Sequence, residues 1–97
     1  MCDPIFEIGQ VVATPAALEA INSAGETALS FLQRHASGDW GDVCPEDSVA
    51  NEKAVEDGSR ILSAYRTASG TRIWVITEMQ NDSGHRAATT ILLPEEY

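Results

Sequence analysis

The hydrophobic pattern of this 97-residue chain changes near Arg60, and the change limits the folds open to it. Between residues 14 and 57, apolar residues recur at the three- and four-residue spacing of helices. From residue 61 onward they form short runs rich in β-branched residues, separated by turn signals. Helices in one half and strands in the other are typical of the α+β class, in which helices pack on one face of an antiparallel sheet.

Three helices are predicted in the first half of the chain. Thr14 and Pro15 mark the first start, because threonine caps free amide groups and proline suits the first helical position. Asp47 or Ser48 is expected to cap the third helix, which is short. The predicted helices cover about 15–24, 26–37 and 48–57, and each is followed by a glycine.

Four strands are predicted, over 5–13, 61–67, 71–78 and 88–93. Gly9 is expected to form a bulge in the first strand, and Gly70 supplies the positive φ of a hairpin turn at 68–70. The order is therefore β-α-α-α-β-β-β in a single domain, 1–97. The last three strands form a meander, and the first strand joins it at an edge.

The core is expected to draw on apolar residues of these helices and strands: Leu18, Ile21, Leu29, Phe31, Leu32, Ile61, Leu62 and those of 73–76 and 91–93. Trp40 lies in a loop between glycine and aspartate residues, where it either fills the junction of helices and sheet or anchors an interface. The first role is predicted, with Asp39 and Asp42 directed to water. Trp74 faces away from Ile73 and Val75, so one of these two faces meets the helices.

The charge balance excludes some partners. Fifteen acidic residues against six basic ones give a net charge of -9, which disfavours direct contact with nucleic acid or an anionic membrane. Residues 39–57 hold seven acids against one base, whereas arginines 60, 66, 72 and 86 lie in the strand half. We therefore expect an acidic surface that occupies the basic groove of a nucleic-acid-binding protein; the alternative is that the acids only maintain solubility. The residues expected to bind the partner are Asp39, Trp40, Asp42, Glu46, Asp47, Glu52, Glu56 and Asp57.

A second hypothesis is a small metal-dependent enzyme that uses the acidic loop 39–47 together with His35. The loop lacks the ligand spacing of an EF-hand, and no phosphate-binding loop, dinucleotide fingerprint or HExxH motif occurs. His35 and His85 form no recognisable catalytic pair. No catalytic residue, metal or cofactor is therefore predicted. Cys2 and Cys44 are expected to be free thiols.

A third hypothesis is an antitoxin-like or structural protein that pairs through a sheet edge at 60–67 or 88–93, as a monomer or a homodimer. The first residues lack the basic and apolar regions of a signal peptide, and no apolar run approaches the ~20 residues that span a bilayer. A cytoplasmic location is expected.

Three segments resemble a family of small uncharacterised bacterial proteins that are often described as plasmid-related: RHASGDWGD at 34–42, WVITE at 74–78 and LLPEEY at 92–97. The resemblance extends over nearly the whole chain. It implies an association with mobile elements, and it favours a role as a small acidic inhibitor of CRISPR or restriction complexes. It implies no substrate and no catalytic residues.

Overall fold

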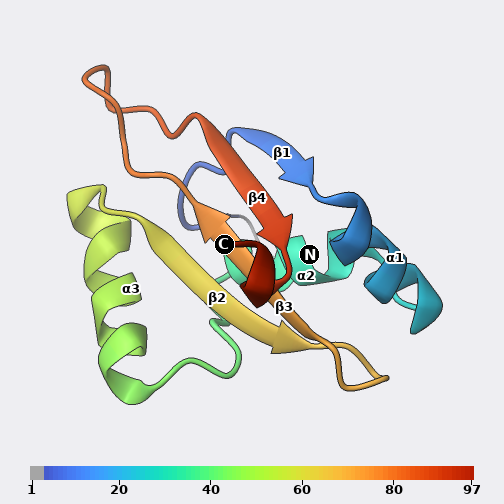
Figure 1. The fold of residues 1–97 in the computed structure, drawn as a ribbon. Coiled ribbons are helices and arrows are strands. Elements are labelled where there is room, and N and C mark those ends of the chain that lie inside the picture. Colours follow the sequence, from blue (N-terminus) through green and yellow to red (C-terminus); the bar gives the residue numbers. More distant parts are fainter. Residues whose placement is uncertain (1–3) are drawn as a thin grey trace.

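The computed structural model describes residues 4–97 and has helices on one side of a four-stranded sheet. Helix α2 lies behind the sheet, α1 lies beyond the end of β1, α3 lies alongside β2, and the short helix η1 lies in front (Figure 1). The elements are β1 (Gln10–Ala13), α1 (Pro15–Ser23), α2 (Ala28–Ala36), α3 (Pro45–Asp57), β2 (Ile61–Arg66), β3 (Arg72–Thr77), β4 (Ala88–Leu92) and η1 (Pro94–Glu96). The predicted α+β class and element order are confirmed.

The strand order in the sheet is β1-β4-β3-β2. Strands β2, β3 and β4 form the predicted antiparallel meander, and β1 joins it at an edge, as expected. The prediction of a purely antiparallel sheet is wrong, because β1 runs parallel to β4 with Val11 opposite Thr89. Apolar alternation carries no information on strand direction, and a helical crossover, unlike a tight turn, permits parallel neighbours.

The first strand is shorter than predicted, since residues 5–9 form no strand and Ile5 contacts the last residue of α2. Ile5 N–H donates to the Ala36 carbonyl, and Phe6 is buried there. Gly9 precedes the strand and forms no bulge within it. Its φ is +69°, and a Cβ atom would lie 2.3 Å from the Arg86 carbonyl oxygen, so glycine is required at this close approach.

The helix starts follow local capping chemistry. Thr14 caps α1, accepting a hydrogen bond of 3.2 Å from the Ala17 amide, and Pro15 is the first helical residue, as predicted. The predicted cap of α3 at Asp47 or Ser48 is wrong: the helix begins at Pro45, after Cys44. Proline already has a helical φ and no N–H to satisfy, so the helix starts there without a side-chain cap.

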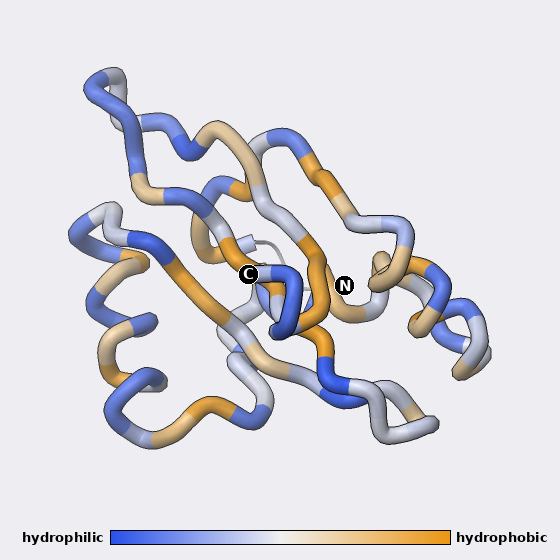
Figure 2. Tube along the Cα trace, in the orientation of Figure 1, coloured by the Kyte–Doolittle hydropathy of each residue, from blue (hydrophilic) through white to orange (hydrophobic). Residues whose placement is uncertain are grey.

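Two clusters of buried residues form the core. The larger lies between α1, α2 and the sheet, and comprises Ala17, Ile21, Phe31, Tyr65, Ile73, Val75 and Ile91; the smaller comprises Phe6, Trp40, Ala54 and Ile61. Figure 2 shows hydrophobic residues along the central strands and many hydrophilic residues over α3. The prediction that Leu18 and Leu29 belong to the core is wrong, because they are 38% and 61% exposed. Both helices have more apolar residues than one face can hold, so spacing alone does not select the buried ones.

The other face of the sheet is covered in part by the C-terminal residues. Trp74 lies on this face, away from the buried Ile73 and Val75, and its ring meets Tyr97 edge-on at 5.7 Å. The Arg60 guanidinium donates a hydrogen bond to the Tyr97 hydroxyl. Within residues 4–97, no helix combines the length and the apolar character needed to cross a membrane.

Candidate functional site

Trp40 joins the acidic loop to the core. Its side chain is 5% exposed, and its ring centroid lies 6.0 Å from those of both Phe6 and His35. The indole Nε1–H donates to Glu52 of α3 at 2.9 Å, so a buried ring holds a carboxylate of the helix surface. The predicted position of the indole, between helices and sheet, is confirmed.

The chain after Trp40 adds to the edge of β2. The Ala64 amide donates to the Trp40 carbonyl at 3.0 Å, and the Asp42 amide donates to the Ala64 carbonyl at 2.6 Å. Gly41 lies between these bonds with a φ of +74°, where a Cβ atom would be only 2.0 Å from the Ala64 oxygen. Glycine therefore permits the loop to approach the strand this closely.

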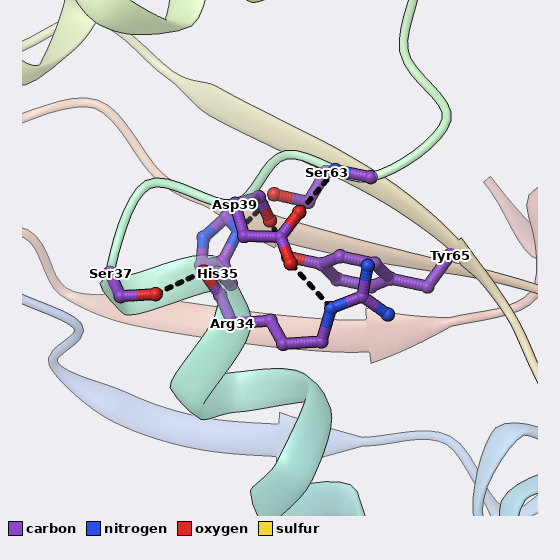
Figure 3. A network of polar contacts seen from close by, with 7 residues as sticks. Arg34, His35, Ser37, Asp39, Ser63 and Tyr65 are labelled. Atoms are coloured by element: carbon purple, nitrogen blue, oxygen red, sulfur yellow. Dashed lines mark hydrogen bonds and ion pairs between the residues drawn. The ribbon is translucent and has the colours of Figure 1, made fainter. Parts of the chain in front are cut away.

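Asp39 is held by its own neighbours (Figure 3). Its carboxylate accepts a 2.7 Å hydrogen bond from Arg34 Nε and a 3.2 Å hydrogen bond from the Gly41 amide. Its backbone carbonyl accepts from the Tyr65 hydroxyl at 2.5 Å, and the Arg34 guanidinium lies 4.4 Å from the Tyr65 ring. The hydrogen bond from Arg34 lowers the pKa of Asp39. Asp39 is thus half exposed, as expected, but its charge is already paired.

Asp42 also faces arginine. Its carboxylate is exposed and lies 3.8 Å from Arg66 Nε. Together with Arg72 and Trp74, these residues line a shallow hollow beside β2 and β3. The two loop acids are therefore opposed by the chain's own cations, which the sequence did not indicate.

Hydrogen bonds at two positions, Asn51 and Ala54, fix helix α3 to the rest of the protein. Asn51 and Ala54 are its buried residues. The Asn51 amide donates to the Leu62 carbonyl at 2.7 Å and accepts from the Leu62 amide at 3.1 Å. The Ala54 carbonyl accepts from Arg86 Nη2 at 2.8 Å, and the same buried guanidinium donates to the carbonyls of Ser59 and Glu78. The sequence analysis predicted neither the role of Asn51 nor that of Arg86. Asn51 could have been found from its spacing, because it lies three residues before Ala54 on the buried side of the helix.

The outer side of α3 carries a set of neighbouring side chains that we call the acidic helix face: Glu46, Val49, Glu52, Lys53 and Glu56. Val49 is 68% exposed, with Glu46 and Glu52 three residues away on either side and Lys53 four residues further on. In residues 4–97 the ion pairs involve Asp39, Asp42 and Glu7, and none involves an acid of α3. The predicted site residues thus fall into two groups: Asp39 and Asp42 in the loop, which form ion pairs with arginines, and the acids of α3, which form none within residues 4–97.

The two remaining predicted acids lie off this face. Asp47 lines a second hollow with Arg60 and Leu62. Asp57, at the helix C-terminus, accepts a 2.8 Å hydrogen bond from the Ser59 amide, and the hydrogen bonds from Ser59 lower its pKa. No basic residue lies in the last turn of α3, where the helix dipole favours cations. The acidic composition therefore does not stabilise the C-terminal end of the helix.

His35 belongs to a buried polar network and not to an accessible site. Nδ1 lies 2.6 Å from Ser63 Oγ and Nε2 lies 2.8 Å from Thr77 Oγ1; all three residues are 0% exposed. Burial, with the charge of Arg86, lowers the pKa of His35 to about 4. His85 instead lies 3.3 Å from Glu7, so the two histidines have different partners. Ser63 and Thr77 occupy inward-facing positions of β2 and β3. Their place in the strand alternation is the sequence feature that could have predicted this network.

The acids do not gather around a metal position. In the described part of the chain, no group of three or more histidine, cysteine, aspartate or glutamate residues is placed to hold a metal ion. Cys44 is an exposed free thiol, and Cys2 lies outside the described residues.

Comparison with known proteins gives no relative for this site. The chain matches no model of a protein family, no curated protein and no solved structure.

Proposed function

We propose that this protein binds a cationic surface of a partner protein, with the acidic helix face as its point of contact. The observation that carries the proposal is the exposed Val49 on the same helix face as Glu46, Glu52 and Glu56, none of which forms an ion pair within residues 4–97. Interfaces commonly combine an apolar centre with a charged rim that selects the partner.

The way in which α3 is held supports a binding role over a purely solubilising one. A solubilising charge needs no fixed position, whereas Glu52 is bound to a buried indole and Asn51 makes two hydrogen bonds to one residue of β2. A helix that is already ordered loses little conformational entropy when a partner binds.

The proposed partner is a protein that handles nucleic acid, because the grooves of such proteins present clustered lysine and arginine residues. The net charge of -9 makes the chain a competitor for such a groove and a poor ligand for nucleic acid itself. The resemblance to plasmid-related proteins favours a partner from host defence, such as a CRISPR or restriction complex. The proposed place of action is the cytoplasm, where these complexes work.

The test is affinity capture from a bacterial lysate with the wild-type chain, a Glu46→Lys/Glu56→Lys variant and a matched Asp82→Lys/Glu95→Lys control. Both variants carry the same charge change, and all four positions are exposed. A basic nucleic-acid-binding protein should be retained by the wild type and the control, released by high salt, and lost with the helix variant. Equal retention by both variants would show that the acidic helix face is not the contact.

A further inference from the structure

The two edges of the sheet are finished in different ways. On the outer side of β2, both backbone groups of Leu62 are bonded to the Asn51 side chain. Both groups of Ala64, the next outward residue, are bonded to the backbone of Trp40 and Asp42. The edge formed by β2 is therefore largely closed to another strand, although 60–67 was predicted as a pairing edge. The other predicted edge, 88–93, is wrong because β4 lies between β1 and β3.

The edge formed by β1 is open. The Gln10 amide donates a hydrogen bond to the carbonyl of Ala87, just before β4, and the Thr14 amide donates to the carbonyl of Ile91 in β4. Since backbone groups alternate along a strand, the N–H and C=O groups of Val11 and Ala13 point away from the sheet. Within residues 4–97 no strand lies beyond β1, which is the outermost strand in Figure 1.

The side chains of β1 do not protect this edge. Val11 and Val12 are 47% and 45% exposed, and the strand contains neither lysine nor proline. Natural proteins usually guard an exposed edge with charges, prolines, bulges or a covering segment, because unpaired backbone groups recruit other strands. The β2 edge is covered by Asn51 and the loop at 40–42, whereas the β1 edge has no such cover in the described residues. Strand β1 is therefore available for pairing.

We propose that β1 binds an extended, cationic segment of a partner protein as a fifth strand. Backbone hydrogen bonds to Val11 and Ala13 would supply the pairing, in the manner of strand addition to other sheet edges. Strand β1 forms the edge of the sheet opposite to β2 and α3, so this contact is separate from the one proposed for the acidic helix face.

Charge determines the choice of a cationic segment. Residues 4–33 contain three acids, Glu7, Glu19 and Glu26, and no lysine or arginine. Glu7 precedes β1, and Glu96 contacts its other end through a 2.7 Å hydrogen bond from Thr14 Oγ1. Backbone hydrogen bonds from Arg86 and Leu93 lower the pKa values of Glu7 and Glu96, respectively, which keeps both carboxylates charged.

Two basic residues lie near Glu7, whereas Glu96 forms no ion pair within residues 4–97. The Arg86 guanidinium is 2% exposed and points into the protein, where backbone carbonyls hold it. His85 lies beside Glu7 at 3.3 Å. A second copy of the chain would bring its own net charge of -9, so self-pairing is opposed by repulsion.

The test uses two synthetic peptides with blocked termini, KKTVTVTKK and EETVTVTEE, titrated into the whole chain while backbone amide resonances are followed by NMR. The lysine peptide should shift the amides of Val11 and Ala13 and slow their hydrogen exchange at least tenfold, and the glutamate peptide should not. Val11→Pro should abolish the response, because proline removes an outward amide and is tolerated on edge strands. Val11→Thr keeps the amide and should keep the response.

Several results would overturn the proposal: no shift at β1, equal shifts with both peptides, or an unchanged response in Val11→Pro. A dimer in sedimentation that Val11→Pro dissolves would identify a second copy as the occupant and also overturn it. The Glu46→Lys/Glu56→Lys variant separates the two proposals, since it should bind the lysine peptide as the wild type does. Equal retention of both lysine variants in the lysate capture, with retained peptide binding, would leave the edge proposal standing alone.

Discussion

His35 donates a hydrogen bond from Nε2 to Thr77 Oγ1, 2.8 Å away, and a chain of neighbours determines this direction. The Thr89 hydroxyl donates to the Ile8 carbonyl, so it must accept from Thr77, 2.7 Å away. The Thr77 hydroxyl hydrogen is therefore already used in the bond to Thr89, so Thr77 can only accept a hydrogen bond from His35. Because the ring is neutral at pH 7, Nδ1 accepts from the Ser63 hydroxyl. One backbone carbonyl thus orients four side chains in the core.

This arrangement predicts a loss of stability in mild acid. The pKa of His35 is lowered by burial to about 4 in the folded protein, against 6.5 for the free side chain. Below pH 6.5 the unfolded chain takes up a proton that the folded chain refuses, so the free energy of unfolding falls until about pH 4. The shift in pKa corresponds to a fall of about 3 kcal/mol in the free energy of unfolding. Urea unfolding at a series of pH values between 6.5 and 4 would measure it.

The control for this prediction is the other histidine. His85→Asn should keep the decline between pH 6.5 and 4.5, while His35→Asn should remove most of it, whatever its effect on stability at pH 7. The carboxylates with lowered pKa values contribute below this window, because they take up protons in the unfolded state only near pH 4. A free energy of unfolding that stays constant from pH 6.5 to 4.5 would contradict the prediction.

Truncation of Trp40 should be among the most damaging single changes. Trp40→Ala removes a ring that is 5% exposed and releases Glu52 from its hydrogen bond. The free energy of unfolding should fall by about 3–5 kcal/mol, as for other buried aromatic residues. Val49→Ala, on the exposed helix face, should change it by less than about 0.5 kcal/mol. Melting curves that do not separate the two variants would show that the indole is not part of the core.

Asn51 should be needed both for stability and for keeping the β2 edge closed. Asn51→Ala leaves the amide and carbonyl of Leu62 without their partners, which should cost about 1–3 kcal/mol. The matched control is Asn22→Ala on the exposed side of α1, with an expected change below about 0.5 kcal/mol. The Leu62 amide should also exchange its hydrogen faster in Asn51→Ala, because its hydrogen bond to the Asn51 side chain is lost. Equal stability of the two variants would contradict the proposed role of Asn51.

Much of the fold follows from local signals in the sequence, and much of the site does not. Thr14 and Pro15 predict the start of α1 because capping depends on adjacent residues alone. The direction of β1 depends on how a long crossover returns to the sheet, which no residue of the strand records. The pairing of Asp39 with Arg34 and of Asp42 with Arg66 depends on where the loop meets β2, so composition grouped them with the unpaired acids of α3.

Gly41 should tolerate alanine far less well than Gly70, although both have positive φ values, +74° and +89°. Each substitution places a side chain in the left-handed region, at a cost of about 1–2 kcal/mol. At Gly70 a Cβ atom meets nothing within 4 Å, whereas at Gly41 it would lie 2.0 Å from the Ala64 carbonyl oxygen. Relief of that clash requires the loop to move from β2, with loss of the hydrogen bonds that Trp40 and Asp42 make to Ala64. Gly41→Ala should therefore be at least about 2 kcal/mol less stable than Gly70→Ala, by the usual cost of overpacking and lost hydrogen bonds. Urea unfolding of the two variants measures this difference directly, and equal midpoints would mean that the loop is not bound to the edge of β2.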